Sequence, residues 1–146
     1  MKKIVVINGP NLNFLGIREK SVYGKMNYFE LVDYLSDYAY KVEVELDVFQ
    51  SNSEGAIIDR IQKCYFDEVD AIIINPGAYT HYSYAIRDAI ASVMIPTVEI
   101  HISNIYERED FRKISVIKDV AIKQIYGKGI KGYIEAIDYV VKALPK

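Results

Sequence analysis

Residues 71–82 read Ala-Ile-Ile-Ile-Asn-Pro-Gly-Ala-Tyr-Thr-His-Tyr, and this stretch decides how the rest of the chain is interpreted. The apolar run at 71–74 is typical of a short strand buried on both faces, as in a parallel sheet. Asparagine, proline and glycine then end the strand and turn the chain outward. In open parallel sheets the ligand crevice lies beyond the carboxyl ends of the strands. We therefore expect functional residues at 75–83, where Thr80, His81 and Ser83 are predicted to open the next helix.

Four other segments have the pattern of strands. Residues 4–7 form a second unbroken apolar run, which again indicates a strand buried on both faces. Residues 42–48 alternate apolar and acidic side chains, which predicts a half-exposed strand near the edge of the sheet. The segments 97–100 and 120–125 complete a set of five strands.

Helices are predicted between these strands. The first follows a capping signal at Asn27, the second begins at Ser53, and the last two cover 85–93 and 133–144. Strands that alternate with helices imply right-handed crossovers and an α/β fold, a doubly wound parallel sheet with helices on both faces. The expected strand order is the flavodoxin-like 2-1-3-4-5, with the crevice where the first and third strands diverge.

Composition bounds the classes of function. A chain of 146 residues is expected to form one domain, 1–146. Its net charge of −2 argues against a nucleic-acid or membrane-surface binder, which would carry a basic excess. No apolar run approaches the roughly 20 residues of a membrane span. The one cysteine, Cys64, cannot form an internal disulfide, and no cleavage site follows the first lysines, so a cytoplasmic protein is expected.

No metal or nucleotide site is predicted. The chain has no cluster of cysteine and histidine at zinc spacing. Residues 8–13, Asn-Gly-Pro-Asn-Leu-Asn, match neither the dinucleotide pattern Gly-x-Gly-x-x-Gly nor a Walker loop. The following loop, to about residue 26, is long and rich in glycine, and loops of this length inside a compact domain are usually functional.

The two histidines, His81 and His101, both lie at or just past the carboxyl end of a predicted strand. Either one alone is more often a hydrogen-bonded structural residue, but two at the same edge of the sheet indicate a site. Glu99 lies two residues before His101 on one strand, so their side chains share a face. A carboxylate there would hold the imidazole in one tautomer.

Neutral hydrogen-bonding groups are expected at the same edge, from Asn11, Asn75 and Ser103. Three arginines could add positive charge, and they are Arg18, Arg108 and Arg112. This mixture suits a small, hydroxylated, anionic ligand. For the last two arginines the competing interpretation is an i,i+4 pair on a solvated helix face.

Several blocks of sequence match one family at family spacing. They are Ile7-Asn8-Gly9-Pro10-Asn11-Leu12-Asn13, Arg18-Glu19 with Tyr23-Gly24, Phe49-Gln50-Ser51-Asn52, Ile74-Asn75-Pro76-Gly77-Ala78-Tyr79-Thr80-His81, Arg87-Asp88, Val98-Glu99-Ile100-His101-Ile102-Ser103-Asn104 and Arg108-Glu109-Asp110-Phe111-Arg112. With these blocks in order from about residue 4 to residue 144, the chain resembles the type II 3-dehydroquinate dehydratases. The resemblance implies dehydration of 3-dehydroquinate to 3-dehydroshikimate without metal, cofactor or Schiff base.

The resemblance also implies catalytic roles. Tyr23 is the base that removes the proton from C2, next to the ketone, and Arg18 stabilises charge near it. His101, oriented by Glu99, protonates the departing C1 hydroxyl. Asn11 helps to stabilise the enolate oxygen, through a water.

Binding roles follow in the same way. Asn75, His81 and Arg112 would hold the ring hydroxyls, and the backbone amides of Ile102 and Ser103 the carboxylate. Further implications concern assembly: Asp88 reaches a neighbouring subunit's site, and family members form trimers grouped into dodecamers.

The chain departs from the family pattern at Lys113, Ile114, Tyr82 and Tyr106. These positions lie at the rim and at possible subunit contacts, so they bear on affinity and assembly. Two other functions remain open from the residues themselves. One is another cofactor-free lyase or isomerase that acts on a polyhydroxy acid. The other is a flavodoxin-like module that binds a small anion or nucleotide without turnover.

Overall fold

A single parallel sheet of five strands organises the computed structural model, which describes residues 1–17 and 25–145. The strands are β1 (Lys2–Asn8), β2 (Val44–Gln50), β3 (Ala71–Asn75), β4 (Thr97–Ile100) and β5 (Lys123–Ile125). Their order is β2-β1-β3-β4-β5, and every neighbouring pair is parallel. The predicted α/β class and flavodoxin-like strand order are confirmed.

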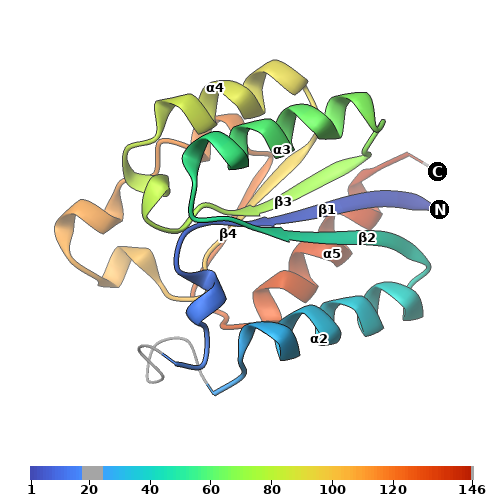
Figure 1. Ribbon diagram of the computed structural model, residues 1–146, viewed down its shortest axis with the longest axis horizontal. Coiled ribbons are helices and arrows are strands. Elements are labelled where there is room, and N and C mark those ends of the chain that lie inside the picture. Colours follow the sequence, from blue (N-terminus) through green and yellow to red (C-terminus); the bar gives the residue numbers. More distant parts are fainter. Residues whose placement is uncertain (18–24, 146) are drawn as a thin grey trace.

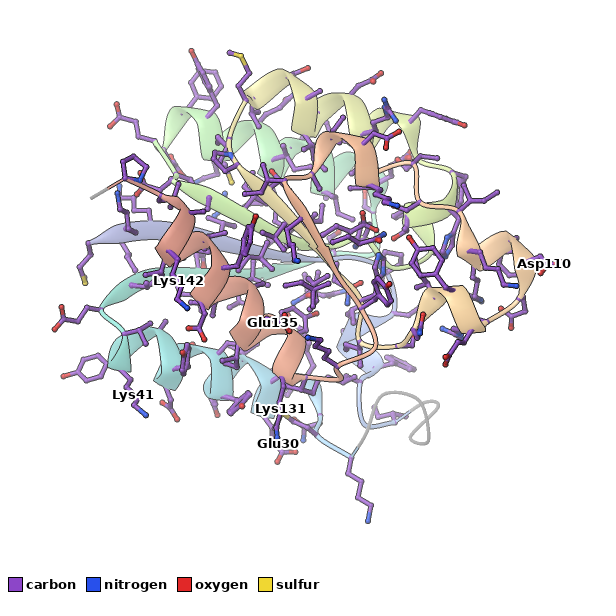
Figure 2. The ribbon with its side chains drawn as sticks, turned by 180° about the vertical axis from the view of Figure 1, so that it is seen from behind. Glu30, Lys41, Asp110, Lys131, Glu135 and Lys142 are labelled. Carbon is purple, nitrogen blue, oxygen red and sulfur yellow. The ribbon has the colours of Figure 1, made fainter. Side chains whose placement is uncertain are left out.

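Two helices cover each face of the sheet (Figure 1). They are α2 (Tyr28–Lys41), α3 (Glu54–Phe66), α4 (Tyr84–Val93) and α5 (Lys131–Ala143). Helices α2 and α5 lie on one face, and α3 and α4 lie on the other. Figure 2 shows charged residues of α2 and α5 on the solvent side of that layer, including Glu30 and Lys131. No helix in the described part of the chain is long and apolar enough to cross a membrane.

The helix starts follow from local capping. Asn27 accepts a hydrogen bond from the backbone N–H of Glu30, whose side chain accepts one from the N–H of Asn27. This reciprocal pair satisfies donors that a helix start would otherwise leave unpaired. Ser53 and Ser83 cap α3 and α4 with their hydroxyl groups.

The sheet separates two apolar cores, and β3 contributes to both. Ile72 and Ile74 pack towards α3 and α4, whereas Ala71 and Ile73 pack towards α2 and α5. Each isoleucine is fully buried, and burial of such a side chain contributes about 1.5–3 kcal/mol. Both faces of the strand at 71–74 are therefore buried, one in each core, which is why the run has no alternating polar residues.

Several element boundaries differ from the prediction. Strand β2 begins at Val44, because α2 continues to Lys41 and Glu43 turns the chain with a φ of 60°. Strand β5 begins only at Lys123, because residues 118–120 form a 3-10 turn whose N–H groups bond locally. Thr80 and His81 do not open α4. They belong to the 3-10 helix η2 (Gly77–His81), and α4 starts after Ser83.

The charged segment after β4 is also different from a single solvated helix. It forms two short 3-10 helices, η3 (Ile105–Glu107) and η4 (Asp110–Lys113), which project beyond the sheet (Figure 1). Arg108 lies between them in an extended conformation. The alternative in which one helix carries Arg108 and Arg112 as an i,i+4 pair is therefore wrong.

The loops after β1 and β3 touch one another. A Cβ atom on Gly9 would lie 2.5 Å from the carbonyl oxygen of Pro76, so only glycine fits there. Gly77 has a φ of 61°, in the left-handed region that favours glycine, and it approaches Pro10. This close contact holds the ends of the two central strands side by side, where the crevice was predicted.

Candidate active site

One cavity opens at the carboxyl ends of β1, β3 and β4, with a volume of about 720 Å³ including its mouth. It brings together seven of the residues singled out from the sequence. They are Asn11, Asn75, His81, His101, Ile102, Ser103 and Arg112. Arg108 also lines the wall, which the sequence suggested only as one of three candidate positive charges. The cavity therefore has amide, imidazole and guanidinium groups around a small volume, as a hydroxylated anion requires.

Four other predicted residues remain, of which only Glu99 and Asp88 are described by the structure, and neither lines the cavity wall. Tyr23 and Arg18 lie outside the described residues. Glu99 is buried behind His101 and reaches the cavity only through it. Asp88 is exposed on α4 and does not line the cavity of its own chain.

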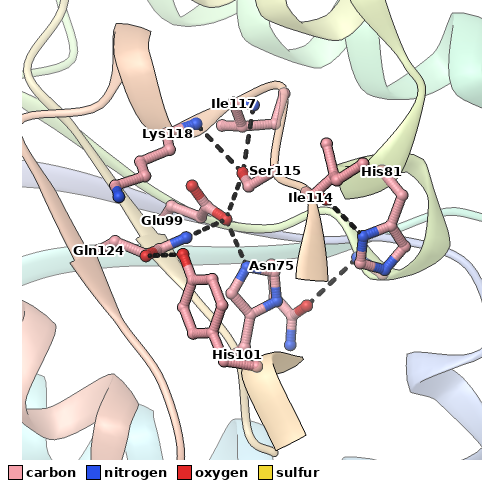
Figure 3. A network of polar contacts seen from close by, with 11 residues as sticks. Asn75, His81, Glu99, His101, Ile114, Ser115, Ile117, Lys118 and Gln124 are labelled. Carbon is pink, nitrogen blue, oxygen red and sulfur yellow. Dashed lines mark hydrogen bonds and ion pairs between the residues drawn. The ribbon is translucent and has the colours of Figure 1, made fainter. Parts of the chain in front are cut away.

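The pairing of His101 with Glu99 is the central polar contact. Nε2 of His101 lies 2.5 Å from Oε2 of Glu99, and the Glu99 side chain is fully buried (Figure 3). Burial by itself would raise the pKa of the Glu99 carboxyl. The hydrogen bond and charge of His101, together with hydrogen bonds from Gln124 and Ser115, outweigh it, so the pKa lies below its ordinary value and the carboxylate stays ionised. The prediction that these side chains share a face is confirmed.

Neutral donors complete the surroundings of Glu99. Its Oε2 atom accepts from the hydroxyl of Ser115 at 2.8 Å and from Nε2 of Gln124 at 3.1 Å. Its other oxygen is buried without a hydrogen-bond partner among the described residues. Neither Ser115 nor Gln124 was identified from the sequence, because nothing in the local pattern of β5 or of the preceding loop distinguishes them from surface polar residues.

His81 has different surroundings. Its Nδ1 atom donates to the backbone carbonyl of Ile114 at 2.7 Å. Burial lowers the pKa of His81, and the neighbouring His101 and Arg112 add to that effect. The ring is therefore held neutral near pH 7, with its lone pair on Nε2. The unusual residue at 114 leaves this contact intact, because the backbone supplies it.

Asn75 is held from below by buried polar side chains. Its Nδ2 atom donates to the phenol of Tyr133 at 3.1 Å, and Tyr133 donates to Oδ1 of Asn8 at 2.6 Å. Tyr133 and Asn8 are both fully buried. Burial raises the pKa of Tyr133 beyond any physiological pH, so it remains a neutral phenol. The sequence placed Tyr133 only on the buried face of the last helix, and its partners became visible only in the folded chain.

Backbone and arginine groups form the remaining wall. The carbonyls of Ile102 and Ser103 accept hydrogen bonds from the N–H groups of Gly129 and Gly127, which anchors this segment to the loop before α5. Arg112 bonds Glu109 through Nε, and its guanidinium lies 4.8 Å from the centre of the Phe111 ring. These contacts orient the positive charge of Arg112 at the cavity edge.

In the described ranges, no three histidine, cysteine, aspartate or glutamate side chains gather as a metal site would need. Cys64 lies on the buried face of α3, in the apolar core, and burial raises the pKa of its thiol. Cys64 therefore serves as a small buried residue of this core.

Comparisons with known proteins agree with one another. The family model "Dehydroquinase class II" matches residues 2–141. The chain is 60% identical over 139 residues to the 3-dehydroquinate dehydratase of Lachnoclostridium phytofermentans, covering 95% of this chain and 96% of that protein. It is 58% identical over 144 residues to that of Caldicellulosiruptor bescii, covering 99% of each.

Solved structures extend the likeness to three dimensions. The type II dehydroquinase from Butyrivibrio crossotus has a TM-score of 0.95 and 60% identity, with 96% of this chain and 97% of that chain covered. The type II dehydroquinase from Propionibacterium acnes has a TM-score of 0.94 at 37% identity, with 97% of both chains covered. Fold and family thus agree along nearly the whole chain.

Proposed function

The chain belongs to the class II dehydroquinase family, and we propose that its cavity dehydrates 3-dehydroquinate to 3-dehydroshikimate by anti elimination through an enolate. The observation that carries the mechanism is the pair formed by His101 and the buried carboxylate of Glu99 at the cavity edge. Hydroxide is a poor leaving group, so an acid must deliver a proton as the C–O bond breaks. An imidazolium held by a carboxylate suits that task.

The first step removes the proton from C2. The proposed base is Tyr23, as the resemblance of its motif implies. An unperturbed tyrosine titrates near pH ~10 and needs a cation to favour its phenolate at neutral pH. Arg18, five residues away, is the proposed cation. The electron pair of the C2–H bond moves onto the ketone oxygen, and Asn11 on the cavity wall would steady that enolate through a water.

The second step expels the C1 hydroxyl. The enolate re-forms the ketone, the electron pair moves into the C1–C2 double bond, and His101 donates a proton so that the hydroxyl leaves as water. Glu99 carries the negative charge that complements the protonated ring before the transfer. The proposal uses no metal, cofactor or lysine imine.

Binding is assigned by the kinds of group on the wall. The neutral His81 ring can accept from a ring hydroxyl through Nε2. Asn75 and Arg112 are assigned to the same hydroxyl side, and the backbone amides of Ile102 and Ser103 to the substrate carboxylate. A carboxylate is stabilised by backbone N–H groups that point into a crevice after a strand.

The proposal extends to assembly. Asp88 is exposed on α4 and lies outside the cavity of its own chain, so a role in substrate binding requires a neighbouring subunit. We assign the enzyme to trimers grouped into a dodecamer, with Asp88 reaching across. The single buried cysteine fits a reducing compartment, and we assign the enzyme to the cytoplasm.

One assay tests the function. The product is a conjugated enone, so mixing the protein with 3-dehydroquinate should raise the ultraviolet absorbance. Tyr23→Phe should keep the fold by circular dichroism and lose most of this turnover. No absorbance rise with folded wild-type protein would remove the assignment, and near-normal turnover in the variant would show that another base acts.

A further inference from the structure

Gln124 lies directly beside Glu99 in the sheet. The two residues are paired in the register of β4 with β5, and Nε2 of Gln124 lies 3.1 Å from Oε2 of Glu99 (Figure 3). Neighbouring residues of parallel strands point to the same face, so the contact follows from the strand pairing. Neither side chain is on the cavity wall, so Gln124 can act on the cavity only through its neighbours.

The orientation of the Gln124 amide is set by a second residue. The phenol of Tyr106 donates to Oε1 of Gln124 at 2.8 Å. An amide whose oxygen accepts on one side must present its NH₂ group on the other, which is the side of Glu99. Tyr106 is itself held, because its backbone N–H donates to Asn104 and its ring packs edge-on against Tyr126 at 4.9 Å. The phenol therefore selects the donor end of Gln124 for Glu99.

The other neutral donor to Glu99 is anchored independently. The Ser115 hydroxyl donates to Oε2, and its oxygen accepts from the backbone N–H groups of Ile117 and Lys118. Ser115 thus depends on a backbone turn, whereas Gln124 depends on one side chain, Tyr106.

We propose that Gln124, oriented by Tyr106, is a positioning residue for the Glu99–His101 pair. It holds the carboxylate in its ionised form with Oε2 directed at the imidazole, and so supports proton delivery to the leaving hydroxyl. The kinetic part of this inference rests on the proposed function. The titratable groups that face Glu99 are His101 on its own strand and, from η2, His81, while the donors from β5 and the 115–118 turn are neutral.

A kinetic experiment compares single and double variants. Gln124→Leu removes the donor at nearly constant volume and should lower kcat about tenfold with KM nearly unchanged, the size expected for one hydrogen bond to a charged group. Tyr106→Phe should act in the same direction but less, and should add nothing in the Gln124→Leu background. In a Glu99→Gln background, Gln124→Leu should cause no further loss, because the anion that it supports is gone. Full additivity would overturn the proposal.

A spectroscopic experiment does not depend on turnover. The carboxyl ¹³C signal of Glu99, assigned with Glu99→Gln, is followed against pH in wild type and in Gln124→Leu. Loss of a donor to the ionised form should move the titration midpoint of Glu99 to higher pH. An unchanged midpoint together with unchanged kcat, even with a lower melting temperature, would mean that Gln124 contributes only to the stability of the fold. If wild type failed to turn over 3-dehydroquinate, the function would fall while this titration still decided the positioning role.

Discussion

The two histidines of the cavity have the same chemistry in isolation and opposite surroundings in the fold. His101 follows β4 and faces a buried carboxylate at 2.5 Å. His81 lies on η2 and donates to a backbone carbonyl, with burial and nearby positive charge keeping it neutral. In the proposed mechanism, His101 on one side of the cavity carries a proton, and His81 on the other side accepts a hydrogen bond. The difference shows that partner identity, and not residue type, assigns a histidine its role.

The largest effect is expected from a substitution of His101, the histidine that donates the proton in the proposed mechanism. His101→Gln keeps a polar side chain of similar size but cannot deliver a proton at neutral pH. We expect kcat to fall about 10²–10⁴-fold, the usual contribution of a general acid, with a small change in KM. Steady-state kinetics would measure this, with circular dichroism as the control for folding. A loss confined to KM would mean that His101 binds substrate and does not protonate the leaving group.

A second substitution removes the negative charge of Glu99, which distinguishes the surroundings of His101 from those of His81. Glu99→Gln preserves shape but leaves His101 without its anionic partner, and we expect kcat to fall about 10–100-fold, as for other outer partners of a reacting group. Turnover close to that of wild type would show that His101 needs no carboxylate.

The same variant tests a pH dependence of stability. The depressed pKa of Glu99 contributes stability above the ordinary glutamate value of 4.5, and this is lost as the pH falls through that value towards the lower folded pKa. Thermal melts between about pH 3 and 7 should therefore be flatter for Glu99→Gln than for wild type. Parallel curves would contradict the assignment of an ionised, stabilising carboxylate.

The third prediction sharpens the comparison on the neutral side. His81→Asn should raise KM about tenfold with a smaller effect on kcat, because it removes binding that is equal in the ground and transition states. In wild type the lowered pKa of His81 means that stability is lost as the pH falls below about 6.5, since the unfolded chain takes up the proton more readily. The variant should lack this component in melts between about pH 5 and 7. A fall in kcat equal to that of His101→Gln would mean that His81 also acts in the chemical step and is not a binding residue alone.

The smallest effect on activity is expected beneath the cavity. Tyr133→Phe leaves Asn8 and Asn75 without a shared partner inside the core, at a cost of about 1–3 kcal/mol in the free energy of unfolding. We expect KM to rise only a few-fold, because Asn75 keeps its contact with the N–H of Gly77. Denaturant titration and kinetics would measure both quantities. Tyr28→Phe is the matched control, because the Tyr28 hydroxyl accepts a hydrogen bond from Nδ2 of the same Asn8 at 3.4 Å.

Much of the site was predictable because strand ends in a parallel sheet share one edge. The position of Asn75 as the last residue of β3, and of His101 directly after β4, places both at the crevice once the strand order is known. The same reasoning missed Gln124, Ser115 and Tyr133, whose partners lie 16 to 125 residues away along the chain. Local pattern carries no information on contacts of that range.

By itself, the sequence of this chain determined the fold class, the strand order and the edge of the sheet where the polar residues gather. Hydrophobic periodicity reports which faces are buried, and burial is the main driving force of the fold. Only the tertiary structure decided that η3 and η4 replace a helix and that the two histidines differ. Hydrogen-bond partners and the pKa directions that they cause depend on atoms brought within about 3 Å by packing, which residue order does not encode locally.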